Sequence, residues 1–414
     1  MQILVLDTIH GGKKIGQALL DAGHGVHFVD VYRGDLSFPG SITGGEAEIG
    51  HYDLMIYPVH LNPAHPLLRN LSCPAITHHD AVRWILGMNK GDKRSHLSHL
   101  IEITGARGKT TTATALAHAL SGPGLLHTSR GRVMYPDEIF LGRESITPAS
   151  LFDAVLEAPD DGWVIAEISL GVCGAGDLAI ITSDDNYLVA NDMRSAWEIK
   201  KGSVLRCRQV LYPSGVMLLH DHGICVGDLV TVEGTRCSYR FNGLSGSFEN
   251  PLFILEGYRT GLSLAAAGAL LLGTKPDRLA TFHSIPGRME IRIEDNRIIL
   301  DNANSGACLK TTLAAVTFLE GIVPNLRCIL VIGQEDRAVC ENFPVEDIIV
   351  AVMQASPKEV VLVAGDDRLD PGLLEHQCNE SGIPCHVVES LEEGLKYARN
   401  IPQYPIVVSV KTWR

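Results

Sequence analysis

The chain has 414 residues, 45% of them hydrophobic and 20% charged, with a formal net charge of −13. This length exceeds what one ordinary hydrophobic core holds, so we expect two or three domains. The composition is typical of a globular protein, and the negative charge argues against a nucleic-acid partner. The longest apolar run, residues 262–272, is too short to span a membrane, and residues 1–7 are typical of a first strand rather than a signal peptide. We therefore expect a cytoplasmic protein without a membrane contact.

Cysteine and histidine usage bears on redox state and metal binding. The ten cysteines are scattered without a Cys-x-x-Cys pair, which favours reduced thiols over a disulfide framework. The seventeen histidines include His78 and His79 and the set His10, His60 and His65, which could ligate a metal. None forms the helical i, i+4 pair of a metal site, so we expect no permanent metal site built from protein side chains alone.

The first segment alternates short strands and helices. We expect strands at residues 2–6, 26–31, 53–57 and 74–77 and a helix at 13–22, which together predict a small parallel α/β sheet. Ligands of open α/β sheets bind at the carboxyl ends of the strands. The loops at that edge hold His10, Gly11, Gly12, His60 and His78, which we take as candidate substrate residues. The alternative is that these are loop residues without a function.

A polar, Gly-containing stretch at residues 87–98 reads as a linker to a second domain. That domain opens with a strand, a glycine turn and a helix start, which together form a phosphate cradle. Its predicted ATP-binding residues are Thr104, Gly105, Ala106, Arg107, Gly108, Lys109, Thr110 and Thr111. Lys109 supplies a mobile cation and Thr110 a hydroxyl ligand for Mg²⁺. The alternative is a tight strand–helix turn with an incidental lysine.

An acidic residue at the end of an apolar strand is the candidate for the Mg²⁺ ligand opposite Thr110. Residues 163–169 read WVIAEIS, and a carboxylate at the end of a buried strand is costly unless it is paired or metal-bound. We therefore expect Glu167 to be the second Mg²⁺ ligand. The alternative is a strand-end carboxylate in water.

Further elements complete the second domain and begin a third. We expect a helix at 148–157 capped by Thr147, strands at 162–168, 178–181 and 187–190, hairpins within 204–244 and a buried helix at 262–272. An alternating stretch at 289–300 and strands at 328–332, 360–363, 386–388 and 406–410 predict another doubly wound α/β unit. The predicted domains are residues 1–92 for substrate binding, 93–287 as a P-loop ATPase and 288–414 as a Rossmann-like domain.

Four motifs in this order resemble the Mur ligase family: Thr-Gly-x-x-Gly-Lys-Thr-Thr, Ala-Glu-Ile-Ser, Pro-Gly-Arg-Met-Glu and Asp-Asn-Ala-Asn. The resemblance covers roughly residues 98–414. It implies an α/β protein of three domains that uses ATP and Mg²⁺ to convert a carboxylate into an acyl phosphate, which a nucleophile then attacks. It further implies catalytic roles for Lys109, Glu167 and Arg288, with Arg288 near the phosphates and Asp301 near the ribose. Gly333, Asp336 and Arg337 match the family's loop at a strand end.

The sequence also departs from that family. Peptide-forming members have Asp-His after the third ATPase strand, whereas this chain has Asp192-Met193, which puts the second Mg²⁺ site in doubt. The usual Ala-His is Ala303-Asn304, and the C-terminal Gly-Lys-Gly-His-Glu signature has become SVKTW at residues 409–413. The lysine that is often carbamylated in the family corresponds to either Lys200 or Lys201.

These departures, with the N-terminal Asp-x-x-His-Gly-Gly, resemble the archaeal coenzyme F-430 synthetases. That resemblance implies a nickel tetrapyrrole, seco-F-430 acid, as substrate and ATP activation of one propionate. A ring carbon then attacks the acyl phosphate, which closes a carbocycle and releases ADP and phosphate. Arg33, Arg69, Arg83 and Lys90 are candidate contacts for its carboxylates. The alternatives are an amide-forming Mur-type ligase and a non-catalytic ATP-binding protein, and the chain is expected to be a monomer or a homodimer.

Overall fold

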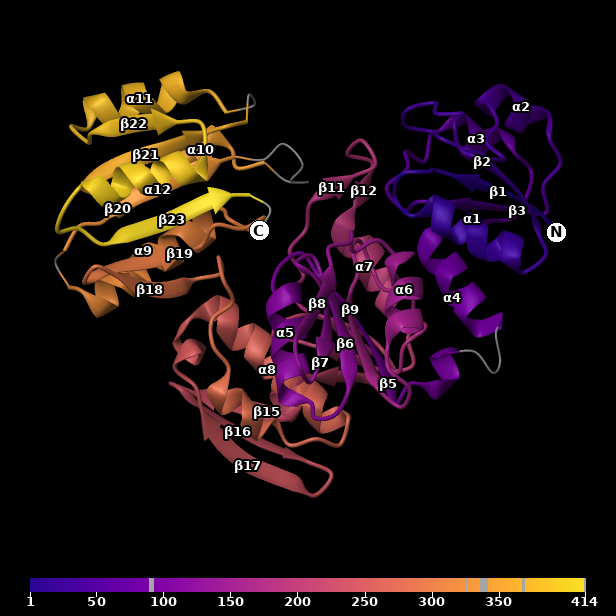
Figure 1. Ribbon diagram of the computed structural model, residues 1–414, viewed down its shortest axis with the longest axis horizontal. Coiled ribbons are helices and arrows are strands. Elements are labelled where there is room, and N and C mark those ends of the chain that lie inside the picture. The colour runs from indigo at the N-terminus through magenta and orange to yellow at the C-terminus, as the bar shows by residue number, and fades with distance from the viewer. Residues whose placement is uncertain (89–92, 325, 336–341, 367–368, 413–414) are drawn as a thin grey trace. The chain divides into compact units, whose positions relative to one another are not determined.

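The computed structural model describes residues 1–88, 93–324, 326–335, 342–366 and 369–412. These residues form two compact units, Met1–Phe282 and His283–Arg414 (Figure 1). None of the described helices is long and apolar enough to cross a membrane. The division into three domains stays a prediction, and each unit is described by itself.

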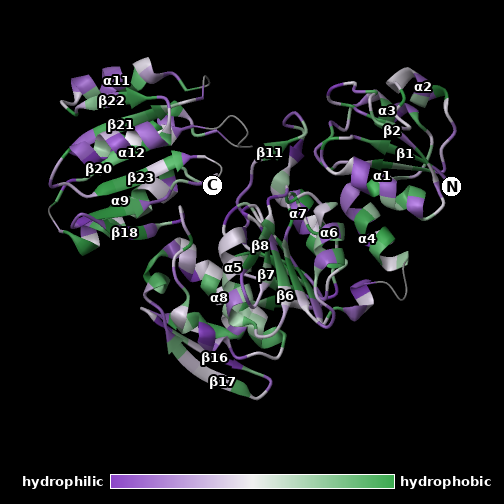
Figure 2. Ribbon diagram, viewed as in Figure 1, coloured by the Kyte–Doolittle hydropathy of each residue, from purple (hydrophilic) through white to green (hydrophobic). Residues whose placement is uncertain are grey.

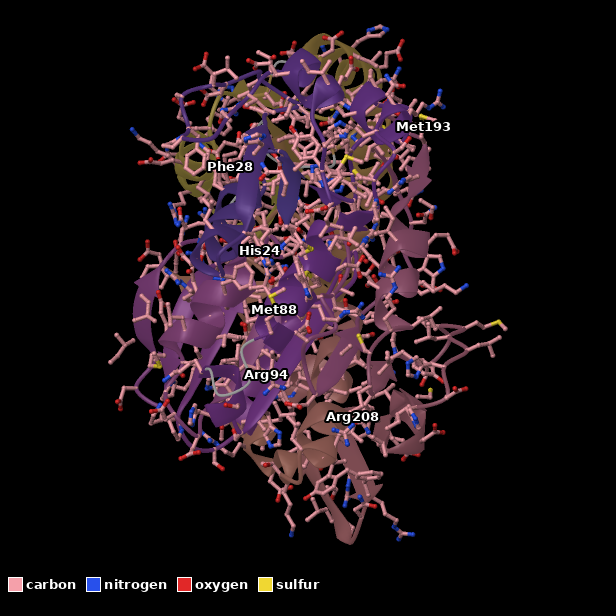
Figure 3. All side chains as sticks on the ribbon, turned by 90° about the vertical axis from the view of Figure 1, so that its right-hand side faces the viewer. His24, Phe28, Met88, Arg94, Met193 and Arg208 are labelled. Atoms are coloured by element: carbon pink, nitrogen blue, oxygen red, sulfur yellow. The ribbon has the colours of Figure 1, made fainter. Side chains whose placement is uncertain are left out.

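The first unit opens with a four-stranded parallel sheet in the order β2-β1-β3-β4. Its strands are β1 (Gln2–Leu6), β2 (Gly25–Val29), β3 (Leu54–Tyr57) and β4 (Ala75–Thr77), and its helices are α1 (Gly12–Asp21), α2 (Gly44–Ile49), α3 (Pro66–Asn70) and α4 (His78–Met88). The predicted parallel α/β sheet is confirmed, with strand bounds shifted by one or two residues. Phe28 is fully buried and lies so close to α1 that a Cβ at Gly16 would stand 2.1 Å from its ring (Figure 3).

An eight-stranded sheet forms the centre of the first unit, in the order β14-β13-β10-β5-β9-β6-β7-β8. Its strands are β5 (His99–Thr104), β6 (Gly124–Thr128), β7 (Gly131–Tyr135), β8 (Ile139–Gly142), β9 (Trp163–Glu167), β10 (Leu178–Ile181), β13 (Val210–Tyr212) and β14 (Gly223–Cys225). The helices of this part are α5 (Lys109–Ala119), α6 (Ser150–Glu157), α7 (Ala196–Val204) and α8 (Glu256–Leu271). Helices α5 and α8 pack closely, because Gly261 leaves room for the side chain of Thr111 (Figure 1). In this strand order β5, which ends at the predicted phosphate loop, lies in the middle of the sheet between β10 and β9.

Several predicted elements of this part were wrong in detail. Residues 204–244 are not all hairpins, since β13 and β14 pair in parallel with the central sheet. Only β15 (Val230–Glu233), β16 (Arg236–Phe241) and β17 (Leu244–Glu249) form an antiparallel sheet. The strand predicted at 187–190 is the short β11 (Leu188–Val189), paired with β12 (Arg194–Ser195). Helix α6 begins at Ser150, and its N-terminus has no side-chain cap. The N–H of Ser150 donates to the backbone carbonyl oxygen of Thr147 rather than to its side chain.

The second unit is a six-stranded sheet in the order β18-β19-β23-β20-β21-β22. Its strands are β18 (Glu290–Glu294), β19 (Arg297–Asp301), β20 (Ile329–Gln334), β21 (Glu359–Ala364), β22 (Cys385–Val388) and β23 (Ile406–Lys411). Its helices are α9 (Leu309–Ile322), α10 (Val345–Ala355), α11 (Pro371–Glu380) and α12 (Leu391–Asn400). Strand β18 is antiparallel and the other pairings are parallel. The apolar inner strands β20, β21 and β23 stand out in Figure 2 and form cores with the helices on both faces, which confirms the predicted doubly wound unit.

Candidate active site

The loop between β5 and α5 has the backbone of a phosphate cradle. Gly105 has φ +144° and Gly108 has φ +79°, a region that disfavours residues with a side chain. A Cβ at Gly105 would stand 2.1 Å from the hydroxyl oxygen of Thr182. Helix α5 then starts at Lys109, and its first N–H groups have no partner within the helix. The turn and the helix start therefore suit the binding of an anion, as the sequence predicts.

The end of the neighbouring strand β10 fixes the shape of this loop. The Thr182 hydroxyl contacts the carbonyl oxygens of Thr104, at 3.2 Å, and Arg107. The hydroxyl oxygen of Ser183 accepts hydrogen bonds from the N–H groups of Ala106 and Arg107, each at 3.2 Å. Sequence reasoning missed both residues. Their position in the sequence could have indicated them, because they are the first polar residues after a buried strand that ends at the same sheet edge.

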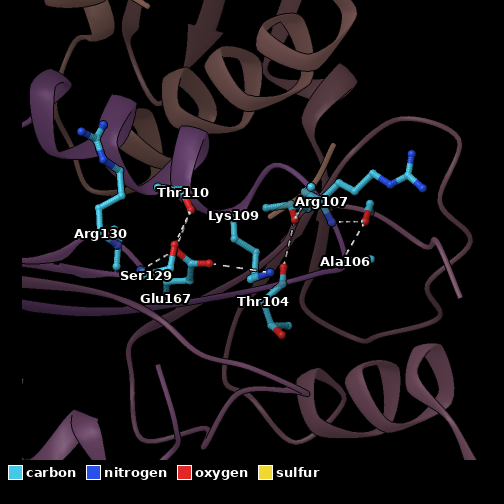
Figure 4. A network of polar contacts seen from close by, with 12 residues as sticks. Thr104, Ala106, Arg107, Lys109, Thr110, Ser129, Arg130 and Glu167 are labelled. Carbon is cyan, nitrogen blue, oxygen red and sulfur yellow. Dashed lines mark hydrogen bonds and ion pairs between the residues drawn. The ribbon is translucent and has the colours of Figure 1, made fainter. Parts of the chain in front are cut away.

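Lys109, Thr110 and Glu167 lie together beside this loop (Figure 4). The Thr110 hydroxyl donates to Oε2 of Glu167 at 2.8 Å, and the Ser129 N–H donates to the same oxygen at 3.2 Å. The Nζ atom of Lys109 lies 3.7 Å from Oε1 of Glu167. All five residues of β9 are buried, so this carboxylate is not a strand-end group in water. The structure thus brings together three residues that the sequence assigned to phosphate and metal binding.

The donor atoms of this cluster fit Mg²⁺. A hydroxyl and a carboxylate are hard oxygen ligands, and Mg²⁺ usually binds through one or two such groups plus waters and phosphate oxygens. Within the described part of the chain there is no group of three or more His, Cys, Asp or Glu side chains that could hold a metal ion. Thr110 and Glu167 are the residues that would hold Mg²⁺ together with the phosphates of a nucleotide, and this role stays a prediction.

A second buried carboxylate supports the loop that follows Glu167. Glu102, on β5, accepts four backbone N–H bonds of 2.6–3.2 Å from the consecutive residues Cys173, Gly174, Ala175 and Gly176. Burial raises the pKa of Glu102, while the four N–H groups act in the opposite direction. Glu102 could not be predicted from the sequence, because its partners lie on a loop whose course depends on the pairing of β5 with β9 and β10.

The candidate residues of the second unit lie at the carboxyl edge of its own sheet. Oδ2 of Asp301 forms an ion pair with the guanidinium of Arg292 at 2.7 Å. Its Oδ1 accepts a hydrogen bond of 2.9 Å from the N–H of Ala303. Asn304, where the Mur ligases have histidine, donates to the carbonyl oxygen of Gly287 at 2.8 Å.

Arg288 belongs to this unit and follows Gly287 directly. Gly333, at φ +139°, belongs to the buried strand β20. Asp336 and Arg337 fall outside the described residues. The phosphate and ribose contacts expected of Arg288 and Asp301 stay predictions.

The N-terminal sheet has a cluster of rings at the carboxyl ends of its strands. The His10 ring packs edge-on against Tyr32 and His60, with centroids 5.1 and 4.6 Å apart. Nδ1 of His10 lies 3.2 Å from the buried carboxylate of Asp7. Burial, and to a lesser degree His10, lowers the pKa of His60 to about 4. Two of the predicted substrate residues, His10 and His60, are therefore brought together.

The other predicted substrate residues lie at helix starts: Gly11 caps α1, Gly12 is the first residue of α1 and His78 is the first residue of α4. A Cβ at Gly12 would stand 1.8 Å from the carbonyl oxygen of Asp7, and one at Gly11 would stand 2.7 Å from Cβ of Ala149. His78 is buried, with Nε2 3.3 Å from the carbonyl oxygen of Leu6, and burial lowers its pKa to about 4. These contacts hold Gly11, Gly12 and His78 in place, and the substrate contact expected of each stays a prediction.

The predicted basic contacts and the two candidate lysines differ in exposure. Arg33 and Arg69 are exposed, Arg83 is partly buried, and Lys90 lies outside the described residues. Lys200 is fully buried, with Nζ 4.4 Å from the centroid of the Tyr187 ring, whereas Lys201 is partly exposed.

The fold is that of the Mur ligases. UDP-N-acetylmuramate–alanine ligase MurC from Thermotoga maritima superimposes with a TM-score of 0.54 at 15% identity, over 99% of this chain and 95% of that one. MurF from Acinetobacter baumannii gives a TM-score of 0.53 at 15% identity, over 86% and 82% of the two chains. MurF from T. maritima, solved in complex with ADP, gives 0.52 at 12% identity, over 87% and 91%.

Comparison of sequences indicates a narrower group of relatives than comparison of folds. Residues 291–412 match the family described as the C-terminal domain of coenzyme F430 synthetase CfbE. The coenzyme F(430) synthetase of Methanosarcina acetivorans is 28% identical, over 100% of this chain and 99% of the relative. That of Methanocaldococcus jannaschii is 24% identical over 84% and 86%. The resemblance predicted from the motifs is confirmed.

Proposed function

We propose that this protein is an ATP-dependent ligase that closes a carbocycle on a nickel tetrapyrrole. It activates one propionate of seco-F-430 acid as an acyl phosphate, a carbon of the same molecule attacks it, and ADP and phosphate are released. This would be the last step of coenzyme F-430 biosynthesis. The protein would act in the cytoplasm, as a monomer or a homodimer.

The contact of Thr110 and Lys109 with the buried Glu167 is the observation that carries the ATP-dependent half of this proposal. These groups lie at the start of α5, where backbone N–H groups and the helix dipole favour phosphate. Bound Mg²⁺ would neutralise charge on the transferring phosphoryl group. Lys109 would add a cation to the same group, and the ADP in one of the Mur-fold neighbours supports nucleotide binding by this fold.

The names of the relatives support the substrate half. Both sequence relatives are coenzyme F(430) synthetases, and one of them aligns over the whole chain. An intramolecular attack needs no pocket for a free amine, only a held geometry. The absence of the Asp-His pair after residue 190 fits this better than the amide-forming alternative.

The test is turnover of defined substrates. Purified protein is given ATP, Mg²⁺ and the ring-open nickel precursor, and ADP and the visible spectrum are followed. We expect ADP release with a spectral shift and without added amine. ADP release only when an amino acid is present would establish the amide-forming alternative, and bound ATP without turnover would establish the non-catalytic one.

A matched pair of lysine variants tests the nucleotide site. Lys109→Ala should abolish ADP formation, because it removes the cation 3.7 Å from Glu167. Lys275→Ala, at an exposed position, should leave it unchanged. Unchanged ADP formation by Lys109→Ala would refute the assignment of this loop.

A further inference from the structure

We propose that His10, held by Asp7, is the general base that removes the proton from the nucleophilic carbon. This inference rests on the proposed function. Ring closure joins that carbon to the activated carboxyl carbon. The C–H electron pair forms the new bond, the bond from the carboxyl carbon to the phosphate oxygen breaks, and phosphate leaves. The proton needs an acceptor, and a positioned side chain is the usual one.

Asp7 is built to orient the His10 ring. Its carboxylate is fully buried and accepts N–H bonds from Ile9 at 2.7 Å and from His10 at 2.9 Å. Burial acts to raise the pKa of Asp7, but the hydrogen bonds of His10 and Ile9 outweigh it and lower the pKa. The ionised carboxylate lies 3.2 Å from Nδ1 of His10, so the neutral ring carries its hydrogen on Nδ1 and presents Nε2 as a proton acceptor.

Three of the other histidines near these strand ends are unsuited to the role. His60, His78 and His79 have pKa values lowered to about 4, chiefly by burial, which makes them weak bases at neutral pH. Nε2 of His79 is also bonded to the carbonyl oxygen of Ser169 at 3.0 Å. The His10 side chain, by contrast, is 40% exposed and can meet a substrate.

Neighbouring rings restrict the orientation of the base. His60 and Tyr32 pack edge-on against His10, and these two rings stack on each other with centroids 5.8 Å apart. Among the described residues, Asp7, Tyr32 and His60 are the titratable groups in contact with the His10 ring. A ring held on two sides by aromatic rings and on a third by a carboxylate loses little entropy when substrate binds.

The loop that carries the base packs against the nucleotide-binding part of the same unit. Gly11 lies against Ala149, where a Cβ would come within 2.7 Å of Cβ of that alanine. Ile146 lies three residues before Ala149, and its carbonyl oxygen accepts a hydrogen bond of 2.9 Å from the N–H of Ser169. Ser169 lies two residues beyond Glu167. A continuous chain of contacts therefore joins the base loop to the predicted Mg²⁺ ligand.

Trapping of the acyl phosphate separates activation from proton removal. With ATP, Mg²⁺, the ring-open nickel precursor and hydroxylamine, the wild-type protein should form both the hydroxamate and the closed ring. His10→Gln and His10→Ala should form hydroxamate at rates within about twofold of wild type. Their ring closure should fall by about 10²–10⁴, the usual contribution of a general base. Exogenous imidazole should restore closure by His10→Ala in proportion to its concentration.

The role of Asp7 and a matched control complete the test. Asp7→Asn should keep hydroxamate formation and slow ring closure, because an amide can donate to Nδ1 and so leave the ring hydrogen on Nε2. His51→Ala, which replaces an exposed histidine between α2 and β3, should behave as wild type.

Two results would overturn the role of His10. They are ring closure at the wild-type rate by both His10 variants, and loss of hydroxamate formation together with closure in folded variants. A wild-type protein that forms neither hydroxamate nor closed ring would refute the proposed function itself.

Discussion

Glu167 ends a fully buried strand with a hydroxyl, a backbone amide and an ammonium group around its carboxylate. Glu167→Gln keeps the shape and an acceptor oxygen but removes the charge. We expect ADP formation to fall by about 10²–10³, as when one stabilising polar group of a transition state is lost. The half-saturating Mg²⁺ concentration should rise. Both are measured by Mg²⁺ titration of ADP release, with Glu233→Gln, an exposed residue, as control. An unchanged Mg²⁺ dependence would remove Glu167 from the metal site.

Buried histidines predict how stability depends on pH. His78, His79 and His127 have pKa values of about 4, lowered chiefly by burial from an ordinary value of 6.5. Between these values the unfolded chain binds more protons than the folded one. Stability is therefore complete above pH 6.5 and falls toward pH 4, by about 1.4 kcal/mol per pH unit for each histidine at the steepest point.

Denaturant unfolding at a series of pH values measures this effect. His127→Gln should make the decline shallower, because it removes one of the titrating groups, whereas His51→Ala, which replaces an exposed ring, should not. A free energy of unfolding that stays constant from pH 6.5 to 4 would contradict the burial of these rings.

At the scale of the element, the phosphate loop depends on a glycine. Gly105 combines φ +144° with a Cβ position 2.1 Å from the Thr182 hydroxyl oxygen. Gly105→Ala should therefore distort the loop and weaken nucleotide binding at least tenfold, measured by calorimetry with ADP and Mg²⁺. Gly257→Ala, in α8 with open space around the position, should bind normally and be slightly more stable. Normal binding by Gly105→Ala would show that the loop does not hold the phosphates.

The elements that sequence predicts well are those whose signal is local. Local sequence patterns predict the strand–glycine–helix segment at residues 99–119 and the apolar strands of the α/β sheets. Thr182, Ser183 and Glu102 do not, because their partners are set by which strands become neighbours. The β6-β7-β8 meander and the parallel β13 and β14 were missed for the same reason, since short strands pair according to their tertiary surroundings. The base–carboxylate pair Asp7–His10 was visible only as a short polar motif.

At the scale of the whole molecule, each unit has its own hydrophobic core. The sheet of His283–Arg414 is covered on both faces by its own helices. We expect a fragment of residues 283–414 to fold alone with a cooperative thermal transition by circular dichroism. It should form no ADP, because Lys109 and Glu167 lie in the other unit. A fragment without a cooperative transition would show that this unit needs the first one to fold.

Isotope transfer tests the central claim, carboxylate activation followed by attack of carbon, most directly. The ring-open nickel precursor is prepared with ¹⁸O in both oxygens of the reacting propionate, and the released phosphate is analysed by mass spectrometry after turnover with unlabelled ATP. If the carboxylate is phosphorylated and then attacked by carbon, each phosphate carries one ¹⁸O and one closed ring forms per ADP. Closed ring formed with unlabelled phosphate would contradict the acyl-phosphate route.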